Sequence, residues 1–156
     1  MGALMYKFNF QFPKKTQITL KQVASLQVKK HEGFRAKPYR DSVGILTIGY
    51  GWNLEANGLP AHMYEELFDI AMDDAMKIAK EFTGEVWDKL NMERQAVLVN
   101  MAYNLGYRLM KFVTLRSAIR SLNYEYAARR MRTSLWYKQV GNRGEELSKQ
   151  METGTI

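Results

Sequence analysis

The 156-residue sequence contains no cysteine and only two histidines, His31 and His62. Without cysteine the chain forms neither a disulfide nor a thiolate metal site, and two histidines do not make a zinc site by themselves. We therefore expect no metal and no cofactor.

Long apolar runs are also missing. No run approaches the roughly 18 residues of a membrane-spanning helix, and the N-terminal stretch MGALMYKF lacks the apolar segment of a signal peptide. The sequence shows no internal repeat, no low-complexity run and no long linker. We therefore expect one cooperative unit, monomeric by default, that is made and kept in a cytoplasm.

Acidic residues are outnumbered, because 23 Lys and Arg stand against 16 Asp and Glu for a net charge of +7. An excess of positive charge favours a polyanionic partner such as nucleic acid, an acidic membrane surface or an acidic wall polymer. The sequence has no recognition-helix signature and no glycine-rich phosphate cradle, so we expect no nucleic acid partner.

The first 60 residues predict a small α+β arrangement. Four aromatic residues alternate with polar ones over residues 6–12, which is typical of a strand with one apolar face. Thr19 followed by Gln22 predicts a helix that starts with a capping box, and Gly33 provides its left-handed stop. A turn at residues 42–44 then joins two short strands, and Asn57-Gly58 makes a second turn.

The rest of the sequence has helical spacing. Pro60 suits the first position of a helix, and apolar residues from Met63 to Phe82 mark a long amphipathic helix. Further helices are expected at 92–105, ended by Gly106, and at 111–122, 124–134 and 142–154. The predicted fold class is α+β and mainly α: an extension at 1–17, an added strand or a tail, a small lobe at about 18–59, a connecting helix at 60–82 and an all-helical lobe at 83–156.

The segment HEGFRAKPYRDSVGILTIGYG, from His31 to Gly51, places two carboxylates and a hydroxyl around one small turn. Glu32 ends a helix, where the helix dipole disfavours negative charge and so favours the protonated carboxyl that a general acid needs. Asp41 opens the hairpin among polar groups, which favours its ionised form. Thr47 follows on the returning strand, where its hydroxyl can hold a water. These are the groups that split a glycosidic bond.

The same three residues also have ordinary structural explanations. An aspartate before a turn commonly caps backbone N–H groups, and threonine is at home in a strand. A glutamate at a helix end is usually solvated. The spacing alone therefore leaves the catalytic and the structural interpretation both open.

Three motifs resemble those of the phage-type lysozymes, the endolysin family typified by the T-even phage lysozyme. The first is the segment above, with E-G at the helix end, D opening the hairpin and T-I-G-x-G on the next strand. The second is NMAYNLG, and the third is LWYKQVGNRGEELSKQMETGT. In this order they cover about residues 19–156. The resemblance implies a lysozyme-like α+β fold, and a hydrolase that cuts bacterial peptidoglycan between N-acetylmuramic acid and N-acetylglucosamine.

The resemblance also implies roles for individual residues. Glu32 matches the catalytic acid, Asp41 the second carboxylate, and Thr47 the threonine that holds the attacking water, in an inverting reaction. Arg143 matches an arginine that pairs with the catalytic glutamate across the cleft. Weaker matches at substrate-contacting positions are Asn53, Tyr103, Arg130, and Thr114 or Leu115. With no export signal, the resemblance implies release from the host cytoplasm by a separate permeabilising protein and lysis of the host.

Basic residues gather between Arg108 and Arg132, where seven Lys and Arg face only Glu125. Interleaved apolar residues make this stretch resemble an amphipathic helical pair with a cationic face. Such a face is either ordinary solvated surface or a surface for anionic wall polymer, lipopolysaccharide or membrane phosphates. A noncatalytic cationic module that binds wall or nucleic acid therefore remains the alternative to a hydrolase.

Overall fold

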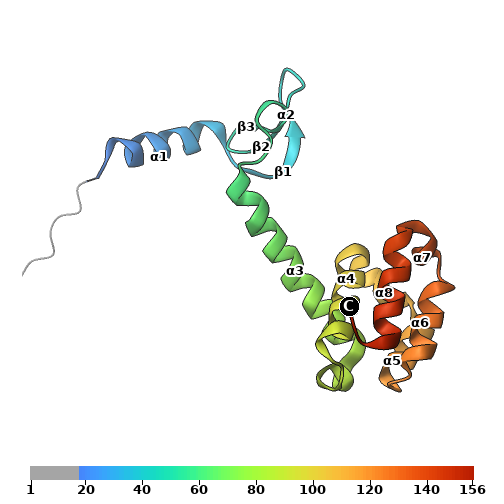
Figure 1. Cartoon of the computed structure of the whole chain (residues 1–156). Coiled ribbons are helices and arrows are strands. Elements are labelled where there is room, and N and C mark those ends of the chain that lie inside the picture. The colour runs from blue at the N-terminus through green and yellow to red at the C-terminus, as the bar shows by residue number, and fades with distance from the viewer. Residues whose placement is uncertain (1–17) are drawn as a thin grey trace, which may run out of the picture. The chain divides into compact units, whose positions relative to one another are not determined.

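The structure is a computed structural model that describes residues 18–156. The strand expected at 6–12 and the extension at 1–17 lie outside the described residues. The described chain divides into two compact units, which we name the N-terminal unit (residues 18–60) and the helical unit (residues 61–156) (Figure 1). One small antiparallel sheet and many helices confirm the expected mainly helical α+β class.

Helix α1 (Leu20–Glu32) begins with the predicted capping box. The Gln22 N–H donates to Thr19 Oγ1 over 3.3 Å, and the Thr19 N–H donates to Gln22 Oε1 over 2.8 Å. Gly33 has the expected positive φ of 68°, but its ψ of 169° is extended rather than helical. The chain therefore leaves α1 and enters the first strand directly, which fixes Glu32 at the junction.

The sheet of the N-terminal unit has the order β1-β2-β3 and is antiparallel throughout. Its strands are β1 (Arg35–Arg40), β2 (Leu46–Gly49) and β3 (Trp52–Asn53). The β1–β2 register is irregular between Arg35 and Tyr39, where Pro38 has no N–H to donate and is tolerated because β1 is an edge strand. The predicted turn between two short strands is confirmed, with Gly44 at φ 88°.

A single helical turn, α2 (Leu54–Asn57), replaces the plain turn expected at Asn57-Gly58. Asn53 Oδ1 accepts from the Ala56 N–H at 2.9 Å and caps its start. The Gly58 N–H closes its end on the Leu54 carbonyl at 3.0 Å. Pro60 directly precedes α3 (Ala61–Thr83) instead of taking its first position, a difference of one residue that helix ends commonly show.

The helical unit contains the predicted helices: α3 is shifted by one residue, the helix at 92–105 has the predicted bounds, and the later ones are shorter. It also contains helical turns that the sequence pattern did not reveal. The 3₁₀ turns are η1 (Gly84–Lys89) and η2 (Gly106–Lys111). The helices after α3 are α4 (Met92–Leu105), α5 (Val113–Arg120), α6 (Tyr124–Arg132), α7 (Leu135–Val140) and α8 (Asn142–Thr153). None of the helices formed by residues 18–156 combines the length and apolar character needed to cross a membrane.

The apolar core of the helical unit runs from Ala75 on α3 to Met151 on α8. Trp136 is buried there, and so are Met101, Met131 and Met151. Met92, by contrast, is 78% exposed. Helix α7, which carries Trp136, was missed because six residues are too few to show a helical period.

Arg132 joins α6 to α8 through two carboxylates. Its Nε and Nη2 donate to Glu145 at 3.0 and 3.1 Å, and its Nη1 donates to Glu152 at 2.8 Å. The Tyr137 hydroxyl donates to the same Glu145 carboxylate at 2.9 Å. The Arg132 and Tyr137 hydrogen bonds lower the pKa of Glu145. Arg132 therefore adds no uncompensated charge to the basic stretch, because these two carboxylates neutralise it. Both carboxylates belong to α8, which lies outside that stretch of the sequence.

Candidate active site and substrate pockets

Glu32 lies beside the connection between β2 and β3. A Cβ placed on Gly51 would lie 3.4 Å from Glu32 Oε2. Gly51 also has a φ of 87°, a backbone conformation that L side chains rarely adopt. The absence of a side chain at Gly51 therefore lets the backbone turn sharply and lets the Glu32 carboxylate approach the end of the sheet.

Asp41 holds the turn at the other end of β2. Its Oδ1 accepts from the Val43 N–H at 3.0 Å and from the Ile45 N–H at 2.8 Å. This is the structural cap that the sequence left open as an alternative. The second carboxylate oxygen makes no hydrogen bond to any protein group among residues 18–156. Capping therefore fixes the orientation of Asp41 and leaves one oxygen for a water or a substrate.

Thr47 is buried in the middle of β2, at 4% exposure. Its Oγ1 donates to the Ile45 carbonyl at 3.1 Å. A hydroxyl has one proton and two acceptor positions, so Thr47 has used its donor on the backbone and remains an acceptor. It is therefore set to receive an O–H from a bound water, which keeps the lone pairs of that water available for attack.

The strand register places Asp41, Thr47 and Asn53 on one face of the sheet. Thr47 is directly opposite Asn53 on β3, and directly opposed residues project on the same face. The Asp41 N–H donates to the Ile45 carbonyl at 3.0 Å, so Asp41 is opposite Ile45, two residues before Thr47. Residues in this diagonal relation are about 7–8 Å apart. Asp41 and Thr47 are therefore close neighbours on the sheet, and their joint hold on a water stays a prediction.

Asn53 has a structural task besides the substrate contact expected of it. Its side-chain oxygen caps α2 through Ala56. The side-chain amide N–H₂ group remains available, because the cap uses only the oxygen. Asn53 is therefore held by α2 on the same sheet face as Thr47, with its donor group free of that cap.

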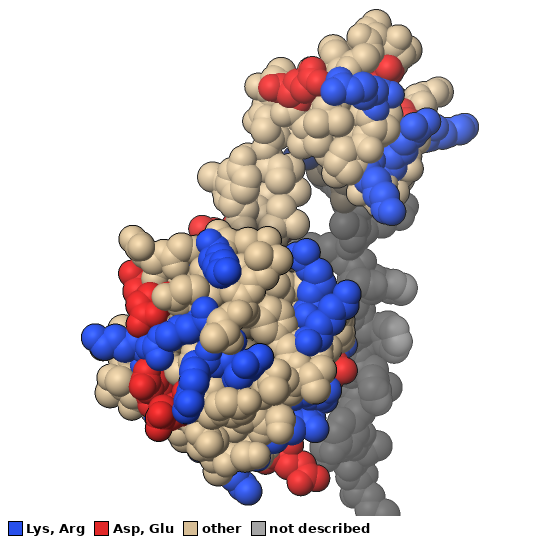
Figure 2. Space-filling model, turned by 90° about the vertical axis from the view of Figure 1, so that its right-hand side faces the viewer, with Lys and Arg blue, Asp and Glu red and all other residues tan. Residues whose placement is uncertain are grey.

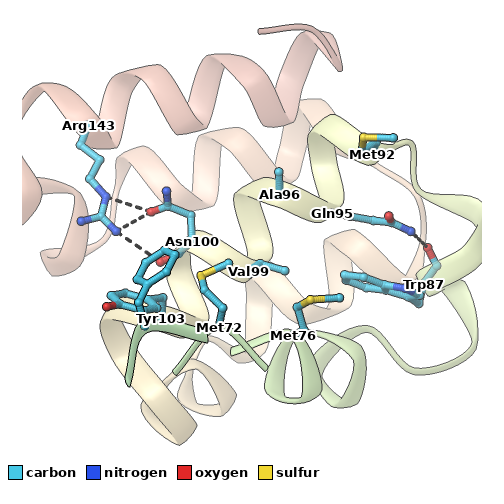
Figure 3. Close-up of a pocket in the computed structure, with 11 residues that line it drawn as sticks. Met72, Met76, Trp87, Met92, Gln95, Ala96, Val99, Asn100, Tyr103 and Arg143 are labelled. Atoms are coloured by element: carbon cyan, nitrogen blue, oxygen red, sulfur yellow. Dashed lines mark hydrogen bonds between the residues drawn. The ribbon is translucent and has the colours of Figure 1, made fainter. Parts of the chain in front are cut away.

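In the helical unit, Tyr103 and Arg143 line one pocket of about 770 Å³ (Figure 3). Methionine, valine and tryptophan side chains form most of its wall, and Arg143, Asn100 and Tyr103 form its polar end. The Tyr103 ring lies 5.8 Å from the Phe68 ring, centroid to centroid. The pocket thus offers an exposed aromatic ring beside a cation, a combination that suits a sugar carrying polar substituents.

Asn100 positions Arg143, and sequence reasoning missed it. Arg143 Nε donates to Asn100 Oδ1 at 2.9 Å, and its Nη2 donates to the Asn100 carbonyl at 3.3 Å and also to Oδ1 (Figure 3). Asn100 is the first residue of the motif NMAYNLG, in which the sequence analysis assigned a role only to Tyr103. A polar residue between buried residues of α4 was the available signal. Arg143 and Glu32 lie in different units, so their pairing stays a prediction.

Thr114 and Arg130 line a second pocket of the helical unit, of about 290 Å³. Leu115, the alternative to Thr114, lines it too, although its side chain belongs to the buried core. The four weaker substrate positions of the sequence are thus divided between the sheet, the first pocket and this second pocket. Among residues 18–156 no group of three or more His, Asp or Glu side chains is arranged to hold a metal ion.

Comparisons with known proteins identify the family of the chain. The family model described as phage lysozyme matches residues 29–152, which include the catalytic candidates and both pockets. The chain is also 29% identical, over 157 residues, to the pre-baseplate central spike protein Gp5 of Enterobacteria phage T4. That match covers 83% of this chain but only 27% of the spike protein, so the chain spans about a quarter of its relative. Since the family model matches most of its length, the chain belongs to the phage lysozyme family.

Proposed function

We propose that the chain is a muramidase, a glycoside hydrolase that cuts peptidoglycan between N-acetylmuramic acid and N-acetylglucosamine. The observation that carries the proposal is the arrangement of Asp41 and Thr47 on one sheet face, with Glu32 held at the end of the same strand. Family membership supports the substrate, because the family model is that of phage lysozyme.

Glu32 acts as the general acid in this proposal. Its proton passes to the glycosidic oxygen as the bond from that oxygen to the anomeric carbon breaks. Gly51 leaves room for the carboxyl group to reach the sugar linkage from the end of the sheet. After the bond breaks, Glu32 is a carboxylate and regains its proton from solvent.

Asp41 and Thr47 supply the nucleophile. A water donates one hydrogen bond to Thr47 Oγ1 and the other to the free oxygen of Asp41, so its own oxygen lone pair is directed at the anomeric carbon. Asp41 takes the water proton as the new C–O bond forms. The family resemblance favours an inverting reaction, which needs a carboxyl separation of about 6.5–9.5 Å to leave room for this water.

The remaining candidates bind substrate in this proposal. Asn53 contacts the sugar beside Thr47, and Tyr103 stacks on a sugar ring at the mouth of the first pocket. Arg143 supplies a cation beside Tyr103. Thr114 and Arg130 contact a part of the substrate that enters the second pocket.

The deciding experiment follows the turbidity of a suspension of purified bacterial walls. We expect the wild type to clear it, and Glu32→Gln and Asp41→Asn each to lower the rate by 100-fold or more, of the order expected for a lost general acid or base. Glu55→Gln is the matched control, because Glu55 is an acidic residue of the same unit that pairs with Arg40 at 3.0 Å. A noncatalytic cationic module would leave every suspension cloudy while still binding the walls.

The biological setting is a separate part of the proposal. A host-lysis role predicts that the chain, produced in a bacterial cytoplasm, causes lysis only when a separate protein permeabilises the membrane. The match to part of a spike protein favours a second setting, in which the same cleavage is made by a component of the virion. Mass spectrometry of purified phage particles distinguishes them, since only the second setting places the chain in the particle.

A further inference from the structure

Helix α1 carries Glu32 but is joined to the sheet of the N-terminal unit by few contacts. No residue of α1 is buried, and among residues 18–60 no hydrogen bond or ion pair links α1 to the strands. Gly33, which connects α1 to the sheet, has a φ of 68°, and a Cβ placed on it would have no neighbour within 4 Å. Glycine restricts the backbone less than any other residue. The direction of Glu32 therefore depends on side-chain contacts around this glycine.

Three side chains make such a contact, which we name the Tyr50 clamp. Its members are Lys29 on α1, Phe34 just before β1, and Tyr50 in the turn between β2 and β3. Lys29 Nζ lies over the Tyr50 ring, 5.3 Å from its centroid. The Phe34 ring lies 5.2 Å from the Tyr50 ring, centroid to centroid, at a tilt of 47°. Both distances are those of favourable cation–π and tilted aromatic pairs, so the clamp joins the end of α1 to this turn.

The Tyr50 clamp lies on both sides of the general acid of the proposed mechanism. Lys29 comes one helical turn before Glu32, and residues three apart are neighbours on a helix surface. Tyr50 directly precedes Gly51, where a Cβ would lie 3.4 Å from Glu32 Oε2. The clamp therefore connects the two elements, α1 and the β2–β3 turn, between which the Glu32 carboxyl group lies.

We infer that Lys29 and Tyr50 are positioning residues, which hold the end of α1 against the β2–β3 turn and so keep the Glu32 carboxyl directed at the sugar linkage. This inference rests on the proposed function, in which Glu32 donates the proton. Exposed rings also stack on sugars, and Phe34 and Tyr50 are 63% and 42% exposed. The Tyr50 ring, however, already has Lys29 over it and Phe34 beside it, which favours an internal contact.

NMR of the full chain tests whether the Tyr50 clamp exists in solution, without requiring catalysis. Because an aromatic ring shifts the signals of protons above it, we expect the side-chain protons of Lys29 to be shifted upfield and to show NOEs to the Tyr50 ring. Tyr50→Phe should keep both signs of contact, and Tyr50→Leu should remove the upfield shift. A wild type without these NOEs would overturn the inference.

Steady-state kinetics on soluble glycan strands separates positioning from sugar contact. A displacement of about 1 Å in a catalytic group lowers the rate by up to roughly 100-fold. We therefore expect Tyr50→Leu to lower kcat about tenfold with little change in KM, and Tyr50→Phe, which keeps the ring, to restore the wild-type kcat. A tenfold rise in KM at unchanged kcat would show that the ring contacts the sugar, and it would overturn the positioning role.

Figure 2 shows basic side chains on the surfaces of both units, so the loss of a charge must be separated from the loss of the contact. Lys29→Gln should lower kcat about threefold, the weight of an exposed cation–π contact. Lys30→Gln is the matched control, because it removes the same charge one position along α1, outside the clamp. Its kcat should equal that of the wild type, and equal losses in the two variants would overturn the inference. Since Lys29 is exposed, this pair decides the matter even if Tyr50→Leu does not fold.

The double variant Lys29→Gln/Tyr50→Leu tests whether the two residues act through one contact. Its kcat should be no lower than that of Tyr50→Leu alone, because neighbours that share an interaction are not additive. Multiplied losses would overturn the shared role.

Failure of this inference and failure of the proposed function give different results. A wild type that shows the NMR contact but cleaves neither walls nor glycan strands overturns the proposed function, and the positioning role with it. A wild type that cleaves both, while Tyr50→Leu retains the wild-type kcat, overturns the positioning role alone.

Discussion

In the N-terminal unit, Thr47 is the only described side chain that is buried, whereas the helical unit buries a continuous apolar core from Ala75 to Met151. The first unit holds its functional groups by short-range hydrogen bonds, such as those from Val43 and Ile45 to Asp41. The second holds its pockets by packed helices. Substitutions in the first unit should therefore change chemistry more than stability, and substitutions in the second should do the reverse.

The largest expected effect on stability is that of Phe82→Ala. Phe82 is fully buried in the helical core, and removing such a ring costs about 3–5 kcal/mol of unfolding free energy. The matched control is Phe34→Ala in the N-terminal unit, where Phe34 is 63% exposed and lies 5.2 Å from the Tyr50 ring. Urea denaturation measures both. Equal losses would contradict the contrast between the two units.

Thr47→Val tests the chemical role of the N-terminal unit. The valine keeps the volume of threonine but removes the acceptor for water, so we expect kcat on walls to fall about 10- to 100-fold, of the order of a lost hydrogen bond in the transition state. Thr47→Ser restores the hydroxyl and should recover most of the activity. A Thr47→Val enzyme with normal kcat would remove Thr47 from the mechanism.

Gly51→Ala tests how closely Glu32 approaches the sheet. The new methyl group would lie 3.4 Å from Glu32 Oε2, and the alanine backbone would have to adopt a φ of 87°. Gly49→Ala is the control, since it imposes a φ of 67° but its Cβ has no neighbour within 4 Å. Backbone strain of about 1–3 kcal/mol is expected in both variants. A several-fold additional loss of kcat should occur only in Gly51→Ala, and the same kcat in both variants would count against a constrained Glu32.

The smallest expected effect concerns acid stability, and it should belong to the helical unit. The Arg132 hydrogen bond, together with that from Tyr137, holds the pKa of Glu145 below its ordinary value of 4.5. A carboxyl group whose pKa is lowered in the folded state stabilises the fold at pH values above its ordinary pKa. This stabilisation is lost as the pH falls below the ordinary pKa toward the lowered one. The melting temperature of Glu145→Gln should therefore depend less on pH between 5 and 3 than that of the wild type. Parallel curves would show that this carboxylate contributes nothing to acid sensitivity.

Local signals predicted much of the fold. The Thr19–Gln22 capping box, the stop at Gly33 and the hairpin turn at 42–44 depend on neighbouring residues only, and all three occur in the structure. Short elements without a period, α2 and α7, were not predicted. The pairing of Arg132 in the basic stretch was not predictable for a different reason: the acids that neutralise it come from α8, outside that stretch.

The candidate site shows the same division. The order and spacing of Glu32, Asp41 and Thr47 were visible in the sequence, and the register explains why Asp41 and Thr47 share a face, because strand neighbours alternate with a period of two. Asn100 as the partner of Arg143, and Thr114 with Arg130 in one pocket, were not visible. These contacts depend on how separate helices pack.

The sequence by itself determined the caps, the hairpin, the helical periods and the family motifs, because each of these rests on residues within a few positions of one another. Only the tertiary structure decided which charges are neutralised and which remain free. Arg132 is paired while Arg130 is not, although both lie on α6 with similar neighbours in the chain. Electrostatic and packing energies depend on distances in space, and those distances are set by the assembly of the helices.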